Sequence, residues 1–514
     1  MAMDLVDKRV DVLAKMPEDV DKIGGKPRIL PVVTLQDGLE DCDEDLAIDA
    51  EVERRLVRKI DRHILPWICV AYLCNYLDRA NLGNAKTLSN DVPGASLSSR
   101  IDLGGTRYST LVALFFVPYA LMEAPSNFFL KRFTPSKWIA RIMVSWGIVT
   151  ACQAAVVNYA GLVACRLMLG LAEAGFYPGC IFYLTFWYRP EERGQRMAIF
   201  AASVAVSGAF SGLLATAISF LNGKGSLFAW QWLFILEAIP AVVVGVLAFF
   251  WMPDYPSTAR FLTPEERRIA EARLGRHAPK GSDRTVDWRV LRATVVDVDF
   301  WLFAVAYFCM TNSLNAVGFF LPSLVASLGF SGWRGQAMTV PPNVFGAIII
   351  LVNAVWSDRR KERCVHALGG LVVVGVGYIL LASTSSVAPR LVGVFFISAT
   401  NAAVIPFLAF RLSTISGSTA TAIASGATIA FANIGGITAP YLFKADEAPF
   451  YPTANYAIFA MQVLAALIIL VLWYRLGSSA LYRVKGCRAE EGGGRGGDSD
   501  GNGMSGKGTG QLAP

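Results

Sequence analysis

The feature that most constrains this chain is a series of apolar stretches, each long enough to cross a lipid bilayer. A helix needs roughly 20 apolar residues to span a hydrocarbon core of about 30 Å, and it satisfies its own backbone hydrogen bonds there. Of the 514 residues, 54% are hydrophobic and 17% are charged, against about 45–50% and about 25% in soluble domains. The sequence therefore predicts an all-α, polytopic membrane protein. Twelve transmembrane helices are expected, at residues 62–83, 107–130, 137–156, 159–186, 195–221, 231–252, 299–325, 337–356, 365–385, 390–411, 419–443 and 455–476.

Basic residues gather in alternate loops between these spans. They precede the first span and lie between spans two and three, four and five, and eight and nine, whereas the intervening loops carry few. Lysine and arginine in short loops favour the cytosolic side of a membrane. We therefore expect both ends of the chain to face the cytosol. The basic residues in question are Arg54, Arg55, Arg58, Lys59, Arg62, Lys131, Arg132, Lys137, Arg189, Arg193, Arg196, Arg359, Arg360, Lys361 and Arg363.

The spans divide into two sets of six, joined by a long polar segment. Each set has a basic loop between its second and third spans, at residues 131–137 and 357–363. Six plus six spans with a long central loop is typical of parallel-repeat transporters, in which a substrate binds midway between the halves. The expected divisions are a disordered cytosolic tail (1–55), an N-terminal six-helix half (56–252), a cytosolic linker (253–296), a C-terminal six-helix half (297–480) and a second disordered cytosolic tail (481–514).

The linker carries a clear helix start. Thr263 is a good N-cap, Pro264 suits the first helical position, and Glu265 and Glu266 place acids in the first turn, where they interact favourably with the helix dipole. We expect an amphipathic cytosolic helix here.

The spans also carry two acid–base pairs. Asp78 and Arg79 are adjacent in the first span, and Arg166 and Glu173 lie in the fourth. A charge at the centre of a membrane helix costs about 2.5–3.5 kcal/mol on insertion scales, so it marks a functional site by default. Taken alone, Asp78 and Arg79 are equally compatible with an interfacial cap on the first helix.

The spacing within the fourth span favours a site. Arg166, Gly170 and Glu173 are related as i, i+4 and i+7 and so share one helix face. Arg166 and Glu173 are about two turns, roughly 10 Å, apart along the axis, so each needs a partner elsewhere, and Asp78 and Arg79 are available. The alternative is a purely structural ion pair between helices. Small residues that allow another helix to approach closely are Gly170, Ala174, Gly175 and Gly179.

Side-chain chemistry suggests roles for these groups. An arginine stays charged when buried and can hold a carboxylate through two parallel hydrogen bonds, so Arg79, Arg166 or both are candidates to bind an anionic substrate. Glu173 and Asp78 are candidates to take up and release a proton near neutral pH as the arginines are occupied. The hydroxyl of Tyr76 is a further candidate ligand. These groups are sufficient equipment for proton-coupled transport of a small carboxylate.

Five motifs carry a resemblance to a known family. They are Tyr-Leu-Asp-Arg-x-Asn-Leu-Gly-Asn-Ala-Lys at 76–86, Arg-x-x-x-Gly-x-x-Glu-Ala-Gly-Phe-x-Pro-Gly at 166–179, Trp-Tyr-x-x-x-Glu-Arg-Gly-x-Arg-Met-Ala at 187–198, Phe-Ile-Leu-Glu-Ala-Ile-Pro at 234–240 and Leu-Thr-Pro-Glu-Glu-Arg at 262–267. The chain resembles the anion:cation symporter family of the major facilitator superfamily. It is most similar there to fungal-type allantoate permeases and their nicotinate, pantothenate and tartrate relatives.

The resemblance implies roles for particular residues. By it, Asp78 and Glu173 are the proton-coupling sites. It also implies a plasma-membrane permease that works without a cofactor, and we expect it to act as a monomer. The residues that the resemblance assigns to the substrate are Tyr76, Arg79, Arg166 and, from the pattern Asn-Ile-Gly-Gly in span eleven, Asn433.

One loop departs from the family's pattern. The segment before span eleven usually reads Asn-x-x-Gly-x-x-Lys-Arg, whereas residues 411–419 here read Arg-Leu-Ser-Thr-Ile-Ser-Gly-Ser-Thr, without the basic pair. This difference bears on gating and on the cytosolic contact of the second half.

Further charged residues are assigned to structure or gating rather than to proton transfer. Glu123 precedes Pro125 near the cytosolic end of its span, and Glu237 precedes Pro240. In the basic loops, Arg193, Asp358 and Arg359 are candidates for latches between the halves. The alternative for these loops is that their charge only sets the topology.

Other functional classes fit the sequence less well. The nine cysteines show no paired spacing and the three histidines are scattered, so no metal site is expected. The net charge of +7 lies largely in loops beside the spans and does not indicate nucleic-acid binding. A membrane enzyme would need a nucleophile with its base, and none of the predicted spans carries a Gly-x-Ser-x-Gly motif. A transporter-like nutrient sensor and an uncoupled facilitator or exchanger remain alternatives. The expected partners are therefore a small carboxylate, a proton and the lipid bilayer.

Overall fold

A computed structural model describes residues 49–274, 296–360, 362–414, 426–448 and 450–492. Within these residues all regular structure is helical, and each of the twelve predicted spans overlaps at least one helix. The expected all-α architecture is confirmed. The helices on the spans are α2 (Ala50–Thr87), α4 (Arg107–Arg132), α5 (Pro135–Cys152), α6 (Tyr159–Glu173), α7 (Phe176–Thr185), α8 (Pro190–Ser219), α9 (Ala229–Trp251), α12 (Val298–Ala326), α14 (Val340–Arg360), α15 (Arg363–Ser383), α16 (Val387–Ile397), α17 (Asn401–Thr414), α19 (Ile434–Leu442) and α20 (Pro452–Gly492).

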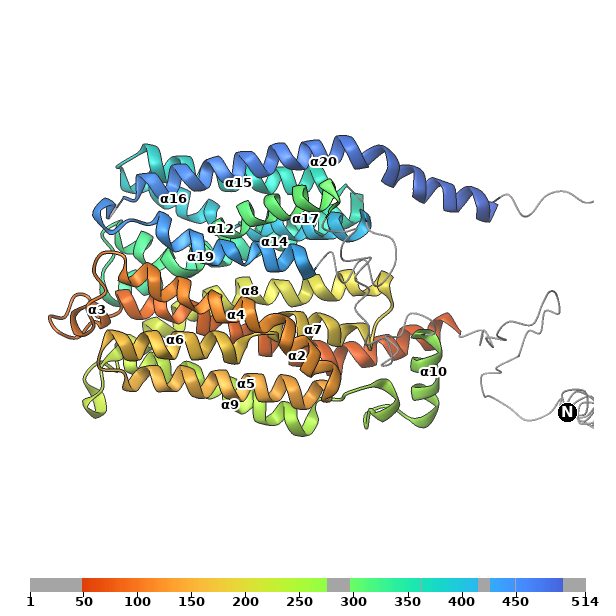
Figure 1. Ribbon diagram of the computed structural model, residues 1–514, viewed down its shortest axis with the longest axis horizontal. Coiled ribbons are helices and arrows are strands. Elements are labelled where there is room, and N and C mark those ends of the chain that lie inside the picture. The colour runs from red at the N-terminus through yellow and green to blue at the C-terminus, as the bar shows by residue number, and fades with distance from the viewer. Residues whose placement is uncertain (1–48, 275–295, 361, 415–425, 449, 493–514) are drawn as a thin grey trace, which may run out of the picture.

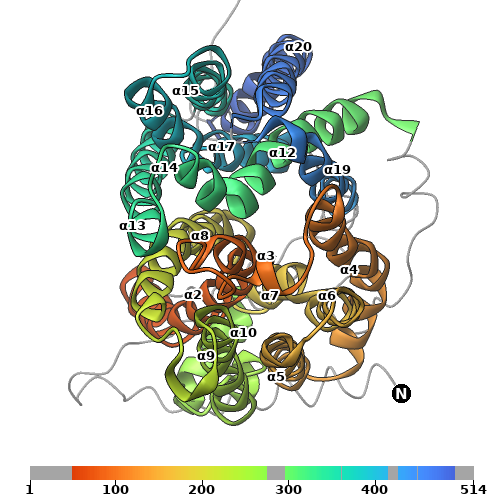
Figure 2. The same ribbon diagram turned by 90° about the vertical axis from the view of Figure 1, so that its left-hand side faces the viewer.

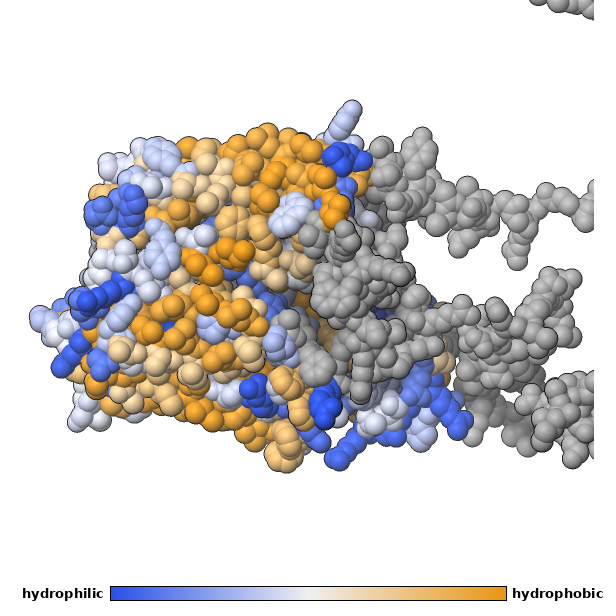
Figure 3. Space-filling view, viewed as in Figure 1, coloured by the Kyte–Doolittle hydropathy of each residue, from blue (hydrophilic) through white to orange (hydrophobic). Residues whose placement is uncertain are grey.

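The outer surface of the helix bundle is apolar. In the described part of the chain, eight helical segments are long and apolar enough to cross a membrane by themselves. Large hydrophobic side chains are exposed on the spans, among them Leu121, Phe250 and Val372. Figure 3 shows hydrophobic residues over the middle of one face and hydrophilic ones at its left end. Such a surface is stable in lipid rather than in water.

The helices form two groups. Viewed end-on, α2 and α4 to α9 make up one group and α12 to α20 the other (Figure 2). Across the boundary, α2 packs against α12, α4 against α19, and α8 against α14. The chemistry of any central site therefore depends on the side chains of α2, α4 and α6 that face α12 and α19.

The two groups are in direct contact at one end of the bundle. We call the end where α2 begins, at Ala50, the proximal end and the end where it finishes, at Thr87, the distal end (Figure 1). At the distal end Tyr108 Oη donates to Phe319 O at 3.0 Å, and Ser109 Oγ donates to Pro440 O at 2.7 Å. Gln336 Nε2 also donates to Thr87 Oγ1 at 2.9 Å. These contacts hold the distal end closed.

The predicted linker helix is α10 (Pro264–Leu274), which lies at the proximal end (Figure 1). Thr263 and Glu266 form a reciprocal capping pair, because Glu266 N donates to Thr263 Oγ1 at 3.2 Å and Thr263 N donates to Glu266 Oε2 at 2.8 Å. The predicted N-cap is confirmed. Lys59 Nζ lies 2.7 Å from Glu266 Oε2 and ties α10 to the first turns of α2.

Two helices extend into segments where the sequence predicts disordered tails. α2 begins at Ala50, and its early turns are held by α10 through the contact of Glu53 with Arg273, at 3.2 Å. α20 continues to Gly492. Its last part contains no proline, and its alanine, leucine, arginine and lysine residues favour helix. Residues 1–48 and 493–514 lie outside the described part.

Candidate functional site

The four charged residues singled out in spans one and four lie together inside the N-terminal group. Asp78 and Arg79 come from α2, and Arg166 and Glu173 come from α6. Glu173 Oε1 accepts from Arg79 Nε at 2.7 Å and lies 2.6 Å from Arg79 Nη2. Asp78, Arg166 and Glu173 are buried, whereas 23% of the Arg79 side chain is exposed. Arg79 is thus the cation of the cluster that a small solute can reach.

Two aromatic rings of α4 flank the Arg79 guanidinium. Its Cζ lies 5.1 Å from the ring centroid of Tyr119 and 5.5 Å from that of Phe115. Rings at this distance attract a cation through their electron-rich faces. Together with the Glu173 carboxylate they hold Arg79 in one orientation, toward α4 and α6.

Arg166 and Asp78 are less well satisfied. Nε and Nη2 of Arg166 and both carboxyl oxygens of Asp78 have no hydrogen-bond partner among the described residues. The two groups attract each other electrostatically, and Asp78 also lies beside the Trp146 indole. No hydrogen bond of good geometry joins Asp78 to either neighbour. Buried charges without such bonds are costly, and this cost indicates a role other than stability.

The fourth span covers Tyr159–Thr185, as predicted, but its helix is interrupted. α6 ends at Glu173, and Gly175 follows with φ of +83° before α7 begins. Glycine is required there for two reasons: the left-handed backbone, and the side chain of Ser126, which a Cβ would overlap. The shared-face argument still holds because Arg166, Gly170 and Glu173 all lie within α6.

Close packing of α4 on α6 positions Glu173. A Cβ at Gly170 would overlap the carbonyl oxygen of Phe115, so the two backbones touch there. Small residues permit this approach between membrane helices. The predicted use of Gly170 and Gly175 for close packing is confirmed, and the contact brings the Arg79 side chain of α2 between α4 and α6.

Span eleven reaches the cluster through an amide. Asn433 Nδ2 donates to Glu123 Oε2 at 3.2 Å, which links α19 of one group to α4 of the other. Glu123 in turn interacts electrostatically with Arg79. The structure therefore places Asn433 and Glu123 beside the Arg79–Glu173 pair, and both lie at the boundary between the two groups.

Tyr76 also lies at this boundary. A Cβ added to Gly318 of α12 would come within 3.3 Å of the Tyr76 hydroxyl oxygen. The hydroxyl therefore faces the C-terminal group, as a ligand to a centrally bound solute would have to.

The latch role of Arg193, Asp358 and Arg359 between the halves stays a prediction. Arg193 donates from Nε to Tyr188 O at 2.8 Å and from Nη2 to Thr185 O at 3.3 Å, which braces the corner between α7 and α8. Arg359 is exposed near the end of α14. The Asp358 side chain, and the part of the unusual 411–419 loop that follows Thr414, lie outside what the structure describes.

Sequence reasoning missed several polar residues next to Asp78. Asn75 and Asn81 are buried, and their amides have no hydrogen-bond partner in the described part of the chain. A signal for them exists, because they lie three residues before and after Asp78 and so share its helix face. Glu237 of α9, assigned above to structure or gating, is also buried and interacts electrostatically with Asp78.

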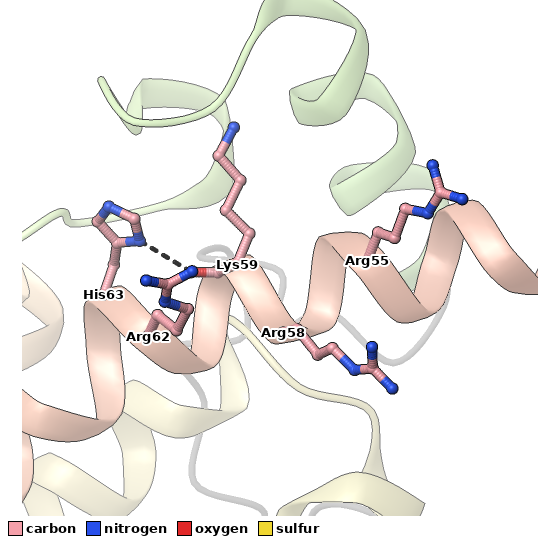
Figure 4. Close-up of a pocket in the computed structure, with 5 residues that line it drawn as sticks. All are labelled: Arg55, Arg58, Lys59, Arg62 and His63. Carbon is pink, nitrogen blue, oxygen red and sulfur yellow. Dashed lines mark hydrogen bonds between the residues drawn. The ribbon is translucent and has the colours of Figure 1, made fainter.

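A separate surface pocket lies on the first turns of α2 (Figure 4). Its volume is about 620 Å³. Arg62 is sixteen residues before Asp78, which is roughly 24 Å along a helix, so the pocket is distinct from the charged cluster. It gathers much of the basic charge that predicts the orientation of the chain. Its lining residues are Arg55, Arg58, Lys59, Arg62 and His63.

Comparison with known proteins places these observations in a family context. A sequence model described as "Major Facilitator Superfamily" matches residues 68–440. The chain is 35% identical to the MFS transporter prlL of a fungal species over 80% of this chain and 83% of that protein. It is 34% identical to the major facilitator-type transporter hxnP of Emericella nidulans, over 87% and 90%, and 30% identical to a putative tartrate transporter of Agrobacterium vitis, over 83% and 96%.

The fold resembles a solved transporter structure. A bacterial homologue of the human lysosomal transporter Spinster, in an inward-facing and unoccupied conformation, superposes with a TM-score of 0.59. The match covers 82% of this chain and 98% of that one, at 15% sequence identity.

Proposed function

This chain belongs to the Major Facilitator Superfamily and is a membrane transporter rather than an enzyme, and we propose that it carries a small organic anion together with a proton by alternating access. The observation that carries the proposal is the ion pair of Arg79 with Glu173 inside the N-terminal group, in which the Arg79 side chain stays partly exposed. The following steps rest on that pair.

Arg79 is the first contact for the anion. Two of its nitrogens contact a single oxygen of Glu173, and Oε2 of Glu173 has no partner among the described residues. A substrate carboxylate can accept two parallel hydrogen bonds from a guanidinium, so it competes with Glu173 for the same donors. Arg166, with unpaired donors in the same cluster, supplies a second positive charge for the anion.

Proton coupling follows from this competition. If the anion takes Arg79, an ionised Glu173 loses its counter-charge while it stays buried, which is strongly unfavourable. Protonation of Glu173 removes that penalty. Anion binding therefore favours proton uptake, and by thermodynamic linkage proton uptake favours anion binding. Release of the anion restores the ion pair and expels the proton.

Alternating access requires the site to open to each side in turn. The closed distal end, together with polar side chains of both groups around Arg79, is consistent with a state open toward the proximal end. The basic residues of that end support a cytosolic location for it, so this state faces the cytosol. By the resemblance described above, we assign the protein to the plasma membrane.

Small carboxylates are the proposed substrate class. Two arginines and the Tyr76 hydroxyl fit a ligand with one or two carboxylates and a further polar group. Tartrate appears in the name of one relative and has this chemistry. Ureides, pyridine carboxylates, vitamins and sugar acids with a carboxylate also fit.

The test is uptake by the full-length protein in proteoliposomes with an imposed pH gradient. A panel of labelled small carboxylates, including tartrate and nicotinate, is screened for accumulation and by mutual competition. We expect at least one to accumulate when the gradient is present and only to equilibrate without it. Equilibration that ignores the gradient would indicate an uncoupled facilitator or exchanger, and binding without flux would indicate a sensor.

A matched pair of variants ties the result to the site. Arg79→Gln should abolish uptake, because it removes the exposed cation of the central cluster. Arg58→Gln removes a cation of similar size from the surface pocket (Figure 4) and should leave uptake unchanged. Equal losses of uptake in both variants would show that transport does not depend on the Arg79–Glu173 pair.

A further inference from the structure

Glu237 occupies an unusual position for a carboxyl group. It lies in α9, only 1% of it is exposed, and neither carboxyl oxygen has a hydrogen-bond partner in the described part of the chain. α9 packs against α2, α5 and α8. Because Glu237 is inside the protein, neither lipid nor water can solvate a charge on it.

The groups that face Glu237 supply no positive charge. The Asp78 carboxyl of α2 acts on it electrostatically, and the Asn81 amide lies beside it without a well-formed hydrogen bond. From α5 the neutral Trp146 indole borders Asp78. Among the described residues no cation acts directly on Glu237.

The charge balance of the cluster is uneven. Glu173 already has Arg79 as its counter-ion. Asp78 is then acted on by the negative charge of Glu173 and by the positive charge of Arg166, and Arg166 can neutralise one carboxylate. Two ionised carboxylates facing each other in an apolar interior would repel each other and both lose their hydration. At least one proton must therefore reside on Asp78 or Glu237.

We propose that Asp78 and Glu237 together form a two-carboxyl proton site, in which Glu237 holds a resident proton and the pair binds a second proton when the substrate anion occupies Arg166. This proposal rests on the transport function proposed above and adds Glu237 to it. With Arg166 free, the pair carries one proton and one negative charge. When an anion takes Arg166, one proton enters from the open side and both carboxyls become neutral; when the anion leaves, that proton leaves.

The decisive measurement needs no transported substrate. Infrared spectroscopy of the full-length protein in liposomes follows the C=O stretching band of protonated carboxyl groups as the pH is raised. We expect the wild type to keep this band at neutral pH, Glu237→Gln to remove the share that belongs to the pair, and Asp78→Asn to keep that share. In each variant the remaining carboxyl should lose its proton at a pH lower by about one unit or more, because the neighbouring negative charge is gone.

The control is Glu123→Gln, which removes another buried span carboxyl, one that accepts a hydrogen bond from Asn433. It should leave the part of the band assigned to Asp78 and Glu237, and its midpoint, unchanged. If Glu237→Gln does not fold, Asp78→Asn decides, since the Glu237 band and its shifted midpoint are then observed directly. An unshifted midpoint in Asp78→Asn, or a band that Glu237→Gln does not reduce, would overturn the two-carboxyl site. Because no anion is present, this result is independent of whether the chain transports carboxylates.

Discussion

The two helix groups treat buried polar groups in opposite ways. In the N-terminal group the buried side chains near the middle of the spans include three carboxyls and an arginine, Asp78, Glu173, Glu237 and Arg166. Most of their polar atoms lack hydrogen-bond partners in the described structure. In the C-terminal group the buried polar side chains of the central helix α12, namely Thr311, Asn312 and Ser313, are hydroxyls and an amide that are hydrogen-bonded to other side chains or to the backbone.

The polar network of the C-terminal group centres on α12. Ser313 Oγ donates to Tyr378 Oη at 3.0 Å and lies 2.9 Å from Thr400 Oγ1. Thr438 Oγ1 donates to Asn312 Oδ1 at 2.8 Å, and Asn312 Nδ2 donates to Phe308 O at 2.9 Å. Satisfied neutral groups stabilise and orient helices, because leaving any one unpaired would cost about 1–3 kcal/mol.

This difference indicates that the two helix groups have different tasks. The N-terminal group keeps charges in a costly environment, where ligand and proton binding can relieve the cost. The C-terminal group offers a rigid, neutral wall that contributes Asn433 at the boundary. The buried arginines of the C-terminal group, Arg390 and Arg411, lie in helix end turns rather than beside the central cluster. Four variants test this assignment.

The largest effect is expected for Glu173→Gln. The variant cannot bind a proton at residue 173, so gradient-driven accumulation of the carboxylate should fall to what the Asp78–Glu237 pair alone can couple. Exchange of internal for external carboxylate should remain measurable, because a glutamine keeps Arg79 free for the anion. Uptake is measured in proteoliposomes with and without a pH gradient. Accumulation that is undiminished by this change would remove Glu173 from the coupling step.

A smaller effect is expected for Arg166→Lys. Lysine keeps the charge but lacks the planar pair of donors. Since a hydrogen bond to a charged group contributes about 1.5–3 kcal/mol, the half-saturating carboxylate concentration should rise roughly tenfold to a hundredfold. Arg141→Lys, at an exposed arginine of α5, is the control and should change nothing. Unchanged affinity in Arg166→Lys would exclude Arg166 from anion binding.

Asn312→Asp introduces a carboxyl into the neutral C-terminal network. It removes the donor to Phe308 O and buries an unpaired group, so we expect a loss of roughly 1–3 kcal/mol in the free energy of unfolding, measured as a lower unfolding temperature in detergent. The number of protons carried per anion should stay the same. Asn158→Asp, at an exposed N-cap of α6 where either residue suits, is the control. A new proton carried by the variant would contradict the division of tasks.

The smallest effect is expected for Tyr378→Phe. It removes a hydroxyl that is bonded to Ser313 and should lower the free energy of unfolding by about 1 kcal/mol, with no change in carboxylate uptake. Tyr474→Phe, at a side chain that is 89% exposed, should have no effect on either. A selective loss of uptake in Tyr378→Phe would show that the C-terminal wall takes part in transport directly.

Much of the fold follows from local sequence. Apolar length predicts the spans, and Thr263 with Glu266 predicts the start of α10, because both signals act within one helix. The sequence also allowed a charged cluster to be predicted, because buried charges in spans need partners of opposite charge. Its members are Asp78, Arg79, Arg166 and Glu173. The break after Glu173 was not predicted, because glycine and alanine in a membrane span fit either a continuous helix or a bend.

The sequence did not determine which buried side chains on different helices interact with one another. From the sequence alone, Glu123 and Glu237 look alike, since each is an acid just before a proline in an apolar span. In three dimensions Glu123 accepts a hydrogen bond from Asn433 of the other group, whereas Glu237 faces a second carboxyl.

The amino-acid sequence by itself determined that this chain crosses a membrane many times, which of its spans carry charge and which helix faces those charges share. These properties depend on residues a few positions apart. The tertiary structure alone decided that Glu173 takes Arg79 as its counter-ion and that Asp78 lies opposite Glu237. The electrostatic environment of a buried group is set by atoms from other helices, whose distance along the chain says nothing about their distance in space.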